Sequence, residues 1–87
     1  MMGNSFSGLE EVKMVVNSFL ALADLNRKIL MIKDNSTGEE FTILPFEYRW
    51  NGNKLINKYG REIVINEVEE VDDYTLDIDL GSYTISV

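Results

Sequence analysis

Apolar residues change their spacing once along this chain, near Asn26, and that change constrains the fold more than any other feature. Before Asn26 they recur every three or four residues, which is the period of a helix with one apolar face. After Asn26, short alternating runs of apolar and polar residues are separated by turn residues, a pattern typical of strands. The sequence therefore predicts an α+β fold: one N-terminal helix packed on a mainly antiparallel sheet of about five to six strands built from hairpins.

The expected helix covers residues 8–23 and begins at a capping box, with Ser7 at the N-cap and Glu10 three residues later. Five residues make up its apolar face: Leu9, Val12, Val16, Phe19 and Ala23. Met14 and Val15 widen the apolar surface beyond a single stripe. Core packing is the favoured reason for this extra surface, and a groove for a partner is the alternative.

Six strands are expected within a single domain, because 87 residues are too few for two domains. Their ranges are 27–34, 40–50, 54–57, 62–71, 74–80 and 83–87. Pro45 interrupts the second strand and cannot donate to a strand ladder, so we expect an edge or a bulge there. Asn51 and Gly52, between the second and third strands, form the strongest short hairpin signal in the chain.

Two hairpins have a register that can be read from the sequence. A four-residue loop at residues 35–38 pairs Lys33 with Glu40 and Leu30 with Ile43, so that opposite charges and apolar groups match. In the last hairpin, a two-residue loop at 81–82 gives three apolar pairs: Leu80 with Tyr83, Ile78 with Ile85, and Leu76 with Val87. The opposite side of this hairpin then shows acidic and hydroxyl side chains to solvent.

The strand at 62–71 does not follow one alternation. Ile63 and Ile65 share one face, whereas Val64 and Val68 share the other. The strand is therefore expected to be buried on both faces at its start or to be bulged near Asn66.

One register of this strand gathers carboxylates on the outer face of the sheet. It turns Val64 and Val68 toward the core, and a three-residue turn then places Glu67 directly opposite Asp77, an arrangement that destabilises a sheet. The outer face would hold four acids: Glu67, Glu69, Asp77 and Asp79. Glu70, Asp72 and Asp73 crowd the adjoining turn.

Charge is divided sharply along the chain. Residues 1–61 hold all eight Lys and Arg residues and seven acids, a net charge of +1. Residues 62–87 hold eight acids and no base, so they account for more than the whole net charge of −7. This asymmetry predicts a partner surface of positive charge and argues against direct binding to nucleic acid or to an anionic membrane.

Several kinds of chemistry have no support in the sequence. The chain has no cysteine and no histidine, which removes the commonest general base and zinc ligand. Residues 34–38 begin like a calcium loop, but Pro45 stands at the twelfth position, where Glu is required. The glycines lie in turns and form no phosphate-binding loop. We therefore expect a protein that is not an enzyme, with no catalytic residues, no cofactor and no metal site.

In size and in charge pattern, the chain resembles the small acidic phage proteins that mimic DNA and inhibit host DNA-binding proteins. Those targets include nucleases, repair glycosylases and the nucleoid protein HU. The resemblance covers the charge pattern of Glu62–Asp79 alone, without a shared motif. It implies that seven carboxylates stand in for phosphates on a basic, nucleic-acid-binding partner: Glu67, Glu69, Glu70, Asp72, Asp73, Asp77 and Asp79.

The acids and the aromatic residues each allow a second interpretation. The acids can simply keep the protein soluble and discourage sheet-edge association, or they can collect a hard cation such as calcium. Four aromatics can lie in the core or form an exposed patch: Phe46, Tyr48, Trp50 and Tyr59. An exposed patch, together with a free edge on the C-terminal strand, would suit an assembly protein of a phage or larger complex, or a homodimer formed by strand addition.

No targeting segment is expected. Residues 15–23 resemble a signal peptide only faintly, because Glu10 and Glu11 precede them where positive charge is required. We expect a cytoplasmic protein, in the host cytoplasm if phage-encoded, whose partner is a basic protein.

Overall fold

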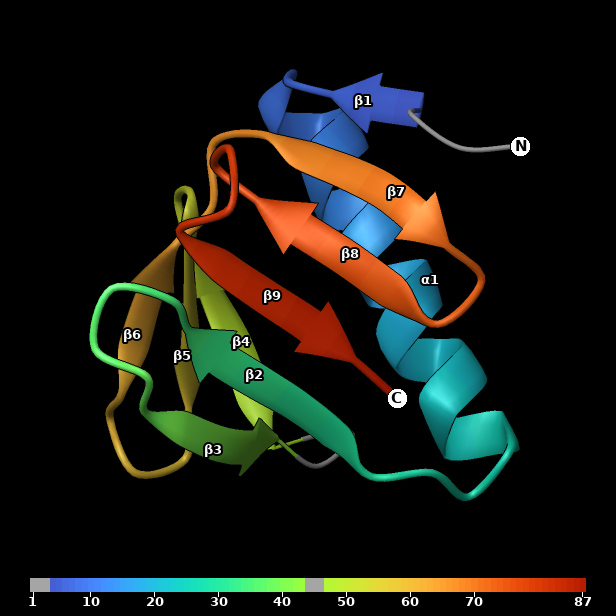
Figure 1. Cartoon of the computed structure of the whole chain (residues 1–87), viewed down its shortest axis with the longest axis vertical. Helices are drawn as coiled ribbons and strands as arrows, with labels where there is room; N and C mark the ends of the chain where they lie inside the picture. Colours follow the sequence, from blue (N-terminus) through green and yellow to red (C-terminus); the bar gives the residue numbers. More distant parts are fainter. Residues whose placement is uncertain (1–3, 44–46) are drawn as a thin grey trace.

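The computed structural model describes residues 4–43 and 47–87, and these form one helix and nine strands (Figure 1). In chain order they are β1 (Asn4–Phe6), α1 (Leu9–Leu25), β2 (Leu30–Asp34), β3 (Glu40–Ile43), β4 (Tyr48–Asn51), β5 (Lys54–Asn57), β6 (Glu62–Val64), β7 (Val68–Asp72), β8 (Thr75–Ile78) and β9 (Tyr83–Ser86). All pairs of neighbouring strands are antiparallel. The predicted α+β class, with one helix on a mainly antiparallel sheet, is confirmed.

The strands form two sheets that share one core. The larger sheet has the order β1-β7-β8-β9-β2-β3, and the smaller has the order β4-β5-β6. Buried residues of α1, of the smaller sheet and of one face of the larger sheet belong to a single apolar cluster. The helix and the smaller sheet therefore cover the same face of the larger sheet, and in Figure 1 both lie behind it.

Alternation along the strands separates the two faces of the larger sheet. Leu76 and Ile78 are buried on the inner face, so Asp77 between them points outward. Thr84 pairs with Asp77, and Lys33 pairs with Thr84, which places both on the outer face as well. The inner face is thus apolar and covered, and the outer face is polar.

The helix begins one residue later than the capping box predicts. Gly8 is the N-cap and makes no side-chain capping bond, so the expected role of Ser7 is wrong. The reason is a strand that the sequence did not predict: Asn4–Phe6 pairs with β7 and holds Ser7 in the link between strand and helix. Glu10 and Glu11 still lie in the first turn, where they interact favourably with the helix dipole.

Two of the expected long strands are each divided between the two sheets. The described part of 40–50 forms β3 in the larger sheet and β4 in the smaller, and Pro45 lies outside the described residues. The strand at 62–71 forms β6 and β7, with a break that includes Asn66, near the predicted bulge. Ile63 and Ile65 are buried and Val64 is exposed, so the expectation that Val64 faces the core is wrong, whereas Val68 is buried as expected.

The two hairpins with a predicted register have different outcomes. The β2–β3 register is confirmed, with Lys33 opposite Glu40 and Leu30 opposite Ile43. In the β8–β9 hairpin β8 ends two residues earlier than predicted, so four different pairs form: Ile78 with Tyr83, Asp77 with Thr84, Leu76 with Ile85, and Thr75 with Ser86. A shift of two residues preserves the faces of Leu76, Asp77 and Ile78, because the side-chain period of a strand is two. Asp79 and Leu80 lie in the turn instead, and Leu80 is exposed, so the expectation that it belongs to the apolar face is wrong.

Candidate protein-binding surface on an acidic hairpin

All seven candidate carboxylates lie on one hairpin, which we call the acidic hairpin and define as residues 67–79, comprising β7, β8 and their flanking turns. This segment contains seven acids and neither Lys nor Arg. The rest of the chain contains eight acids and eight bases, so the entire net charge of −7 lies on these 13 residues. The charge asymmetry of the sequence is therefore concentrated on one structural unit.

The register of the acidic hairpin differs from the predicted one. Val68 faces Ile78, and Glu69, not Glu67, lies directly opposite Asp77. The reason is the turn: Asp72 pairs with Thr75, which leaves a loop of two residues and a bulge between Glu70 and Asp72. Two half-buried carboxylates therefore face each other across the strands on the outer face.

We call Glu69 and Asp77 the outer pair. The strands on either side place no positive charge next to them. The row that runs from β1 to β3 through the pair reads Ser5, Glu69, Asp77, Thr84, Lys33 and Glu40. Lys33 has Glu40 directly opposite it, and Thr84 separates it from Asp77. The hydroxyl of Thr84 donates a long hydrogen bond of 3.5 Å to Asp77 Oδ1.

Three of the predicted acids lie away from the outer face. Glu70 is opposite the buried Leu76, so it belongs to the inner face near the edge of the sheet, where Asn4 Nδ2 donates to its Oε1 at 3.4 Å. Asp72 accepts a bond of 2.8 Å from the backbone N–H of Tyr74 and thereby closes the turn. Glu70, Asp72 and Asp73 all line a hollow between the hairpin and α1.

Asp79 has a structural role that its place in the sequence does not reveal. Its Oδ1 accepts the backbone N–H of Asn66 at 2.9 Å and that of Glu67 at 2.8 Å, and its own N–H donates to Glu67 O at 2.9 Å. These bonds hold the chain where it passes from the smaller sheet to the larger. Asp residues in turns commonly bond the backbone two residues further on, but the partner of Asp79 lies 12 residues earlier and has no local signature.

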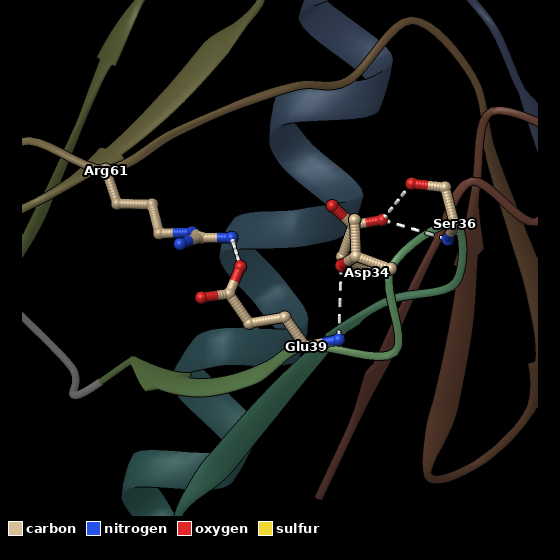
Figure 2. A network of polar contacts seen from close by, with 5 residues as sticks. Asp34, Ser36, Glu39 and Arg61 are labelled. Carbon is tan, nitrogen blue, oxygen red and sulfur yellow. Dashed lines mark hydrogen bonds and ion pairs between the residues drawn. The ribbon is translucent and has the colours of Figure 1, made fainter.

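The acids outside the acidic hairpin include several with well-defined partners. Three ion pairs occur in the described ranges, Lys54–Glu62 at 3.6 Å, Lys58–Glu47 and Arg61–Glu39, and none includes a residue of the hairpin. Figure 2 shows Arg61 reaching Glu39 from the segment before β6. The bond to Glu39 raises the pKa of the Arg61 guanidinium, and the same side chain lies 4.3 Å from the ring centroid of Phe41.

Asp34 is also engaged by its own loop (Figure 2). The hydroxyl of Ser36 donates to Asp34 Oδ1 at 2.7 Å, and the Ser36 backbone N–H donates to the same oxygen at 3.0 Å. These bonds lower the pKa of the Asp34 carboxyl below its usual value. The loop that begins like a calcium site thus uses its first carboxylate to order its own turn.

The three described members of the predicted aromatic set have different surroundings. Tyr48 and Trp50 pack against the core, and Asn17 Oδ1 accepts hydrogen bonds from the Tyr48 hydroxyl at 3.1 Å and from Trp50 Nε1 at 3.0 Å. Tyr59 is exposed, and Phe46 lies outside the described residues. The expected free edge on the C-terminal strand is wrong, because β9 lies between β8 and β2.

Metal ligation and membrane crossing find no structural support in residues 4–43 and 47–87. No three His, Cys, Asp or Glu side chains in these ranges come together as ligands for a metal ion. No helix there has the length and hydrophobicity that crossing a membrane requires.

Comparisons with protein families, with curated proteins and with solved structures give no significant match. Function is therefore inferred from the chemistry of the surface.

Proposed function

We propose that this protein is a non-catalytic binding protein whose acidic hairpin occupies the basic, nucleic-acid-contacting surface of a partner protein and so blocks it. A bacterial nucleoid protein such as HU is an example of the partner class. One observation carries the proposal: seven carboxylates lie within 13 residues, and no ion pair in the described part of the chain uses any of them. Binding would be steered by charge and weakened by salt.

The outer pair supports a role beyond solubility. Glu69 and Asp77 are directly opposite, so their Cβ atoms lie about 5 Å apart and their charges repel. Lys or Arg at either position would create a favourable cross-strand pair. A hairpin selected for stability alone has no reason to place two like charges there, whereas a hairpin that meets a cationic surface recovers that cost on binding.

The test neutralises this pair without changing its shape. The double variant Glu69→Gln/Asp77→Asn removes two charges from the acidic hairpin, and Glu10→Gln/Glu11→Gln removes two exposed charges from the first turn of α1 as the matched control. Each protein is immobilised and exposed to a bacterial lysate at low salt, and bound proteins are eluted with duplex DNA. We expect DNA-eluted nucleic-acid-binding proteins on the wild type and the control, and about tenfold less on the hairpin variant.

Equal capture by both double variants, or bound proteins that duplex DNA does not release, would contradict the proposal. The same experiment addresses the rival function, an assembly protein that binds through exposed aromatics or a sheet edge. In the described chain that rival retains the exposed Tyr59 and the edge strands of both sheets, β1 and β3 in the larger and β4 and β6 in the smaller. It predicts capture that survives high salt and is lost in Tyr59→Ala.

A further inference from the structure

A groove runs between α1 and the acidic hairpin. It consists of two adjoining cavities of about 600 and 590 Å³ that share Phe19, Leu22 and Asp73. Its helical wall extends from Met14 to Asn26, which corresponds to about 18 Å along the helix axis at 1.5 Å per residue. The groove is therefore long enough to accommodate about three turns of another helix.

Apolar side chains line the centre of the groove and much of its helical wall, beside polar residues such as Ser18 and Asn26, and the described part of the chain covers them only in part. Phe19 lies at the junction of the two cavities, while Met14 remains 63% exposed and Leu22 55% exposed on the helical wall. On the opposite side, Tyr74 in the hairpin turn is 65% exposed. Met14 thus belongs to the extra apolar surface of α1 that does not cover the core, whereas Val15, the other residue of that surface, packs against the core.

Carboxylates line one end of this apolar groove. The cavity toward β1 is lined by Glu70, Asp72 and Asp73 and by no basic residue, whereas the cavity toward the end of α1 includes Lys28. The groove is therefore apolar at its centre, over Phe19 and Leu22, and its carboxylates are concentrated toward β1, with Asp73 reaching both cavities. An occupant must match both features.

We infer that this groove binds a basic amphipathic helix of the partner protein, with apolar side chains over Phe19 and Leu22 and Lys or Arg beside Glu70, Asp72 and Asp73. Helix-in-groove recognition uses this combination of apolar anchors and flanking charge. We call Glu70, Asp72 and Asp73 the rim carboxylates of the groove. A second copy of the chain is a poor occupant, because a symmetric contact would bring two sets of these like charges together. The inference rests on the proposed function for the basic character of the partner, but it uses a different face of the hairpin.

The probe is a synthetic peptide of about 18 residues, long enough to form a helix, composed of leucine and lysine on opposite faces. A second peptide has serine in place of leucine and the same charge. We expect the leucine–lysine peptide to bind at least about tenfold more tightly by fluorescence anisotropy, because several leucines are buried. In ¹⁵N spectra its largest shifts should fall at Phe19, Leu22 and Tyr74.

Matched variants separate the groove from general attraction to an acidic protein. Leu22→Ser changes an exposed residue inside the groove, and Leu25→Ser changes an exposed residue of the same helix outside it. Glu70→Gln/Asp73→Asn removes rim charge, with Glu10→Gln/Glu11→Gln as the control. We expect Leu22→Ser and the rim variant each to weaken binding about tenfold, and both controls to bind as the wild type does.

Three outcomes would overturn the inference: equal binding of the two peptides, equal effects of Leu22→Ser and Leu25→Ser, or shifts confined to the outer face around Glu69. A dimer in sedimentation that Leu22→Ser dissociates would also overturn it, because the groove would then be filled by a second copy. Glu69→Gln/Asp77→Asn distinguishes this inference from the proposed function. If that variant leaves both peptide binding and lysate capture unchanged, the inference about the groove is supported, whereas the proposal that the acidic hairpin blocks a nucleic-acid-binding surface is contradicted.

Discussion

The smaller sheet β4-β5-β6 and the acidic hairpin are both built from short antiparallel strands over the same core, but they treat surface charge in opposite ways. Around the smaller sheet, three bases pair with three acids, and Arg61 also lies over the ring of Phe41. On the acidic hairpin, Glu69 faces Asp77 and no base is present. Three of the four bases in the first region are thus paired within the fold, with Arg49 the exception, whereas the acids of the second region have no base beside them on the hairpin.

Asp79 is the exception within the hairpin, and its removal should have the largest effect on stability. Asp79→Ala leaves two backbone N–H groups without their acceptor, and we expect a loss of about 2 kcal/mol. Asp79→Asn should recover most of it, because the amide oxygen still accepts and Asn tolerates the φ of +49°. Urea unfolding measures both. Asp73→Ala, on the same hairpin, should change stability by less than about 0.5 kcal/mol; equal losses at the two positions would refute the structural role.

Reversing one charge in each region should change the stability of the protein in opposite directions. Glu69→Lys converts a repulsive cross-strand pair with Asp77 into an attractive one, and we expect a gain of about 0.5 to 1 kcal/mol at low salt. Lys54→Glu replaces the ion pair with Glu62 by two like charges and should cost a few tenths of a kcal/mol, about what an exposed pair contributes. Thermal unfolding at low and high salt checks both, since screening should shrink each difference. A loss of stability in Glu69→Lys would show that the outer pair is compensated within the fold.

The turns of the two regions differ in the residue that each places at a positive φ, and the gain expected from correcting the less suitable turn is small. The β4–β5 turn places Gly52 at its position with φ +61°, whereas the β8–β9 turn places Leu80 at φ +59° with 92% of the residue exposed. A left-handed conformation is unfavourable for Leu, so Leu80→Asn should stabilise by about 0.5 kcal/mol. Gly52→Ala should destabilise by about 1 kcal/mol. A shift in melting temperature of the opposite sign for Leu80→Asn would indicate that Leu80 makes contacts that stabilise the turn.

The features of the fold that depend on neighbouring residues, such as hairpin register and the face on which a side chain lies, could be predicted from local sequence patterns. The β2–β3 register followed from one four-residue turn and matching cross-strand pairs. In the β8–β9 hairpin the turn was misplaced by two residues, yet Leu76 and Asp77 were assigned to the correct faces, because any even shift preserves them.

Long-range arrangement was not predictable in this way. The passage from β6 to β7 depends on a bond between Asp79 and Glu67, which no pattern around either residue announces. Likewise, Met14 indicated extra apolar surface on the helix, but only the tertiary fold brings Asp73 alongside it to make a groove. All the predicted acids lie on one hairpin, but they have different roles there. Glu69 and Asp77 form the outer pair, Glu70, Asp72 and Asp73 line the groove, and Asp79 bonds the backbone between β6 and β7.

The central position of β9 has a consequence for synthesis. Tyr83–Ser86 joins β8 on one side and β2 on the other, so until these residues emerge from the ribosome the larger sheet consists of two separate pieces. During that time β2 and β8 expose unpaired edges, one of them on the acidic hairpin. Mutual repulsion among seven carboxylates opposes pairing between two such nascent chains, a consequence of the charge that holds whatever the partner of the folded protein is.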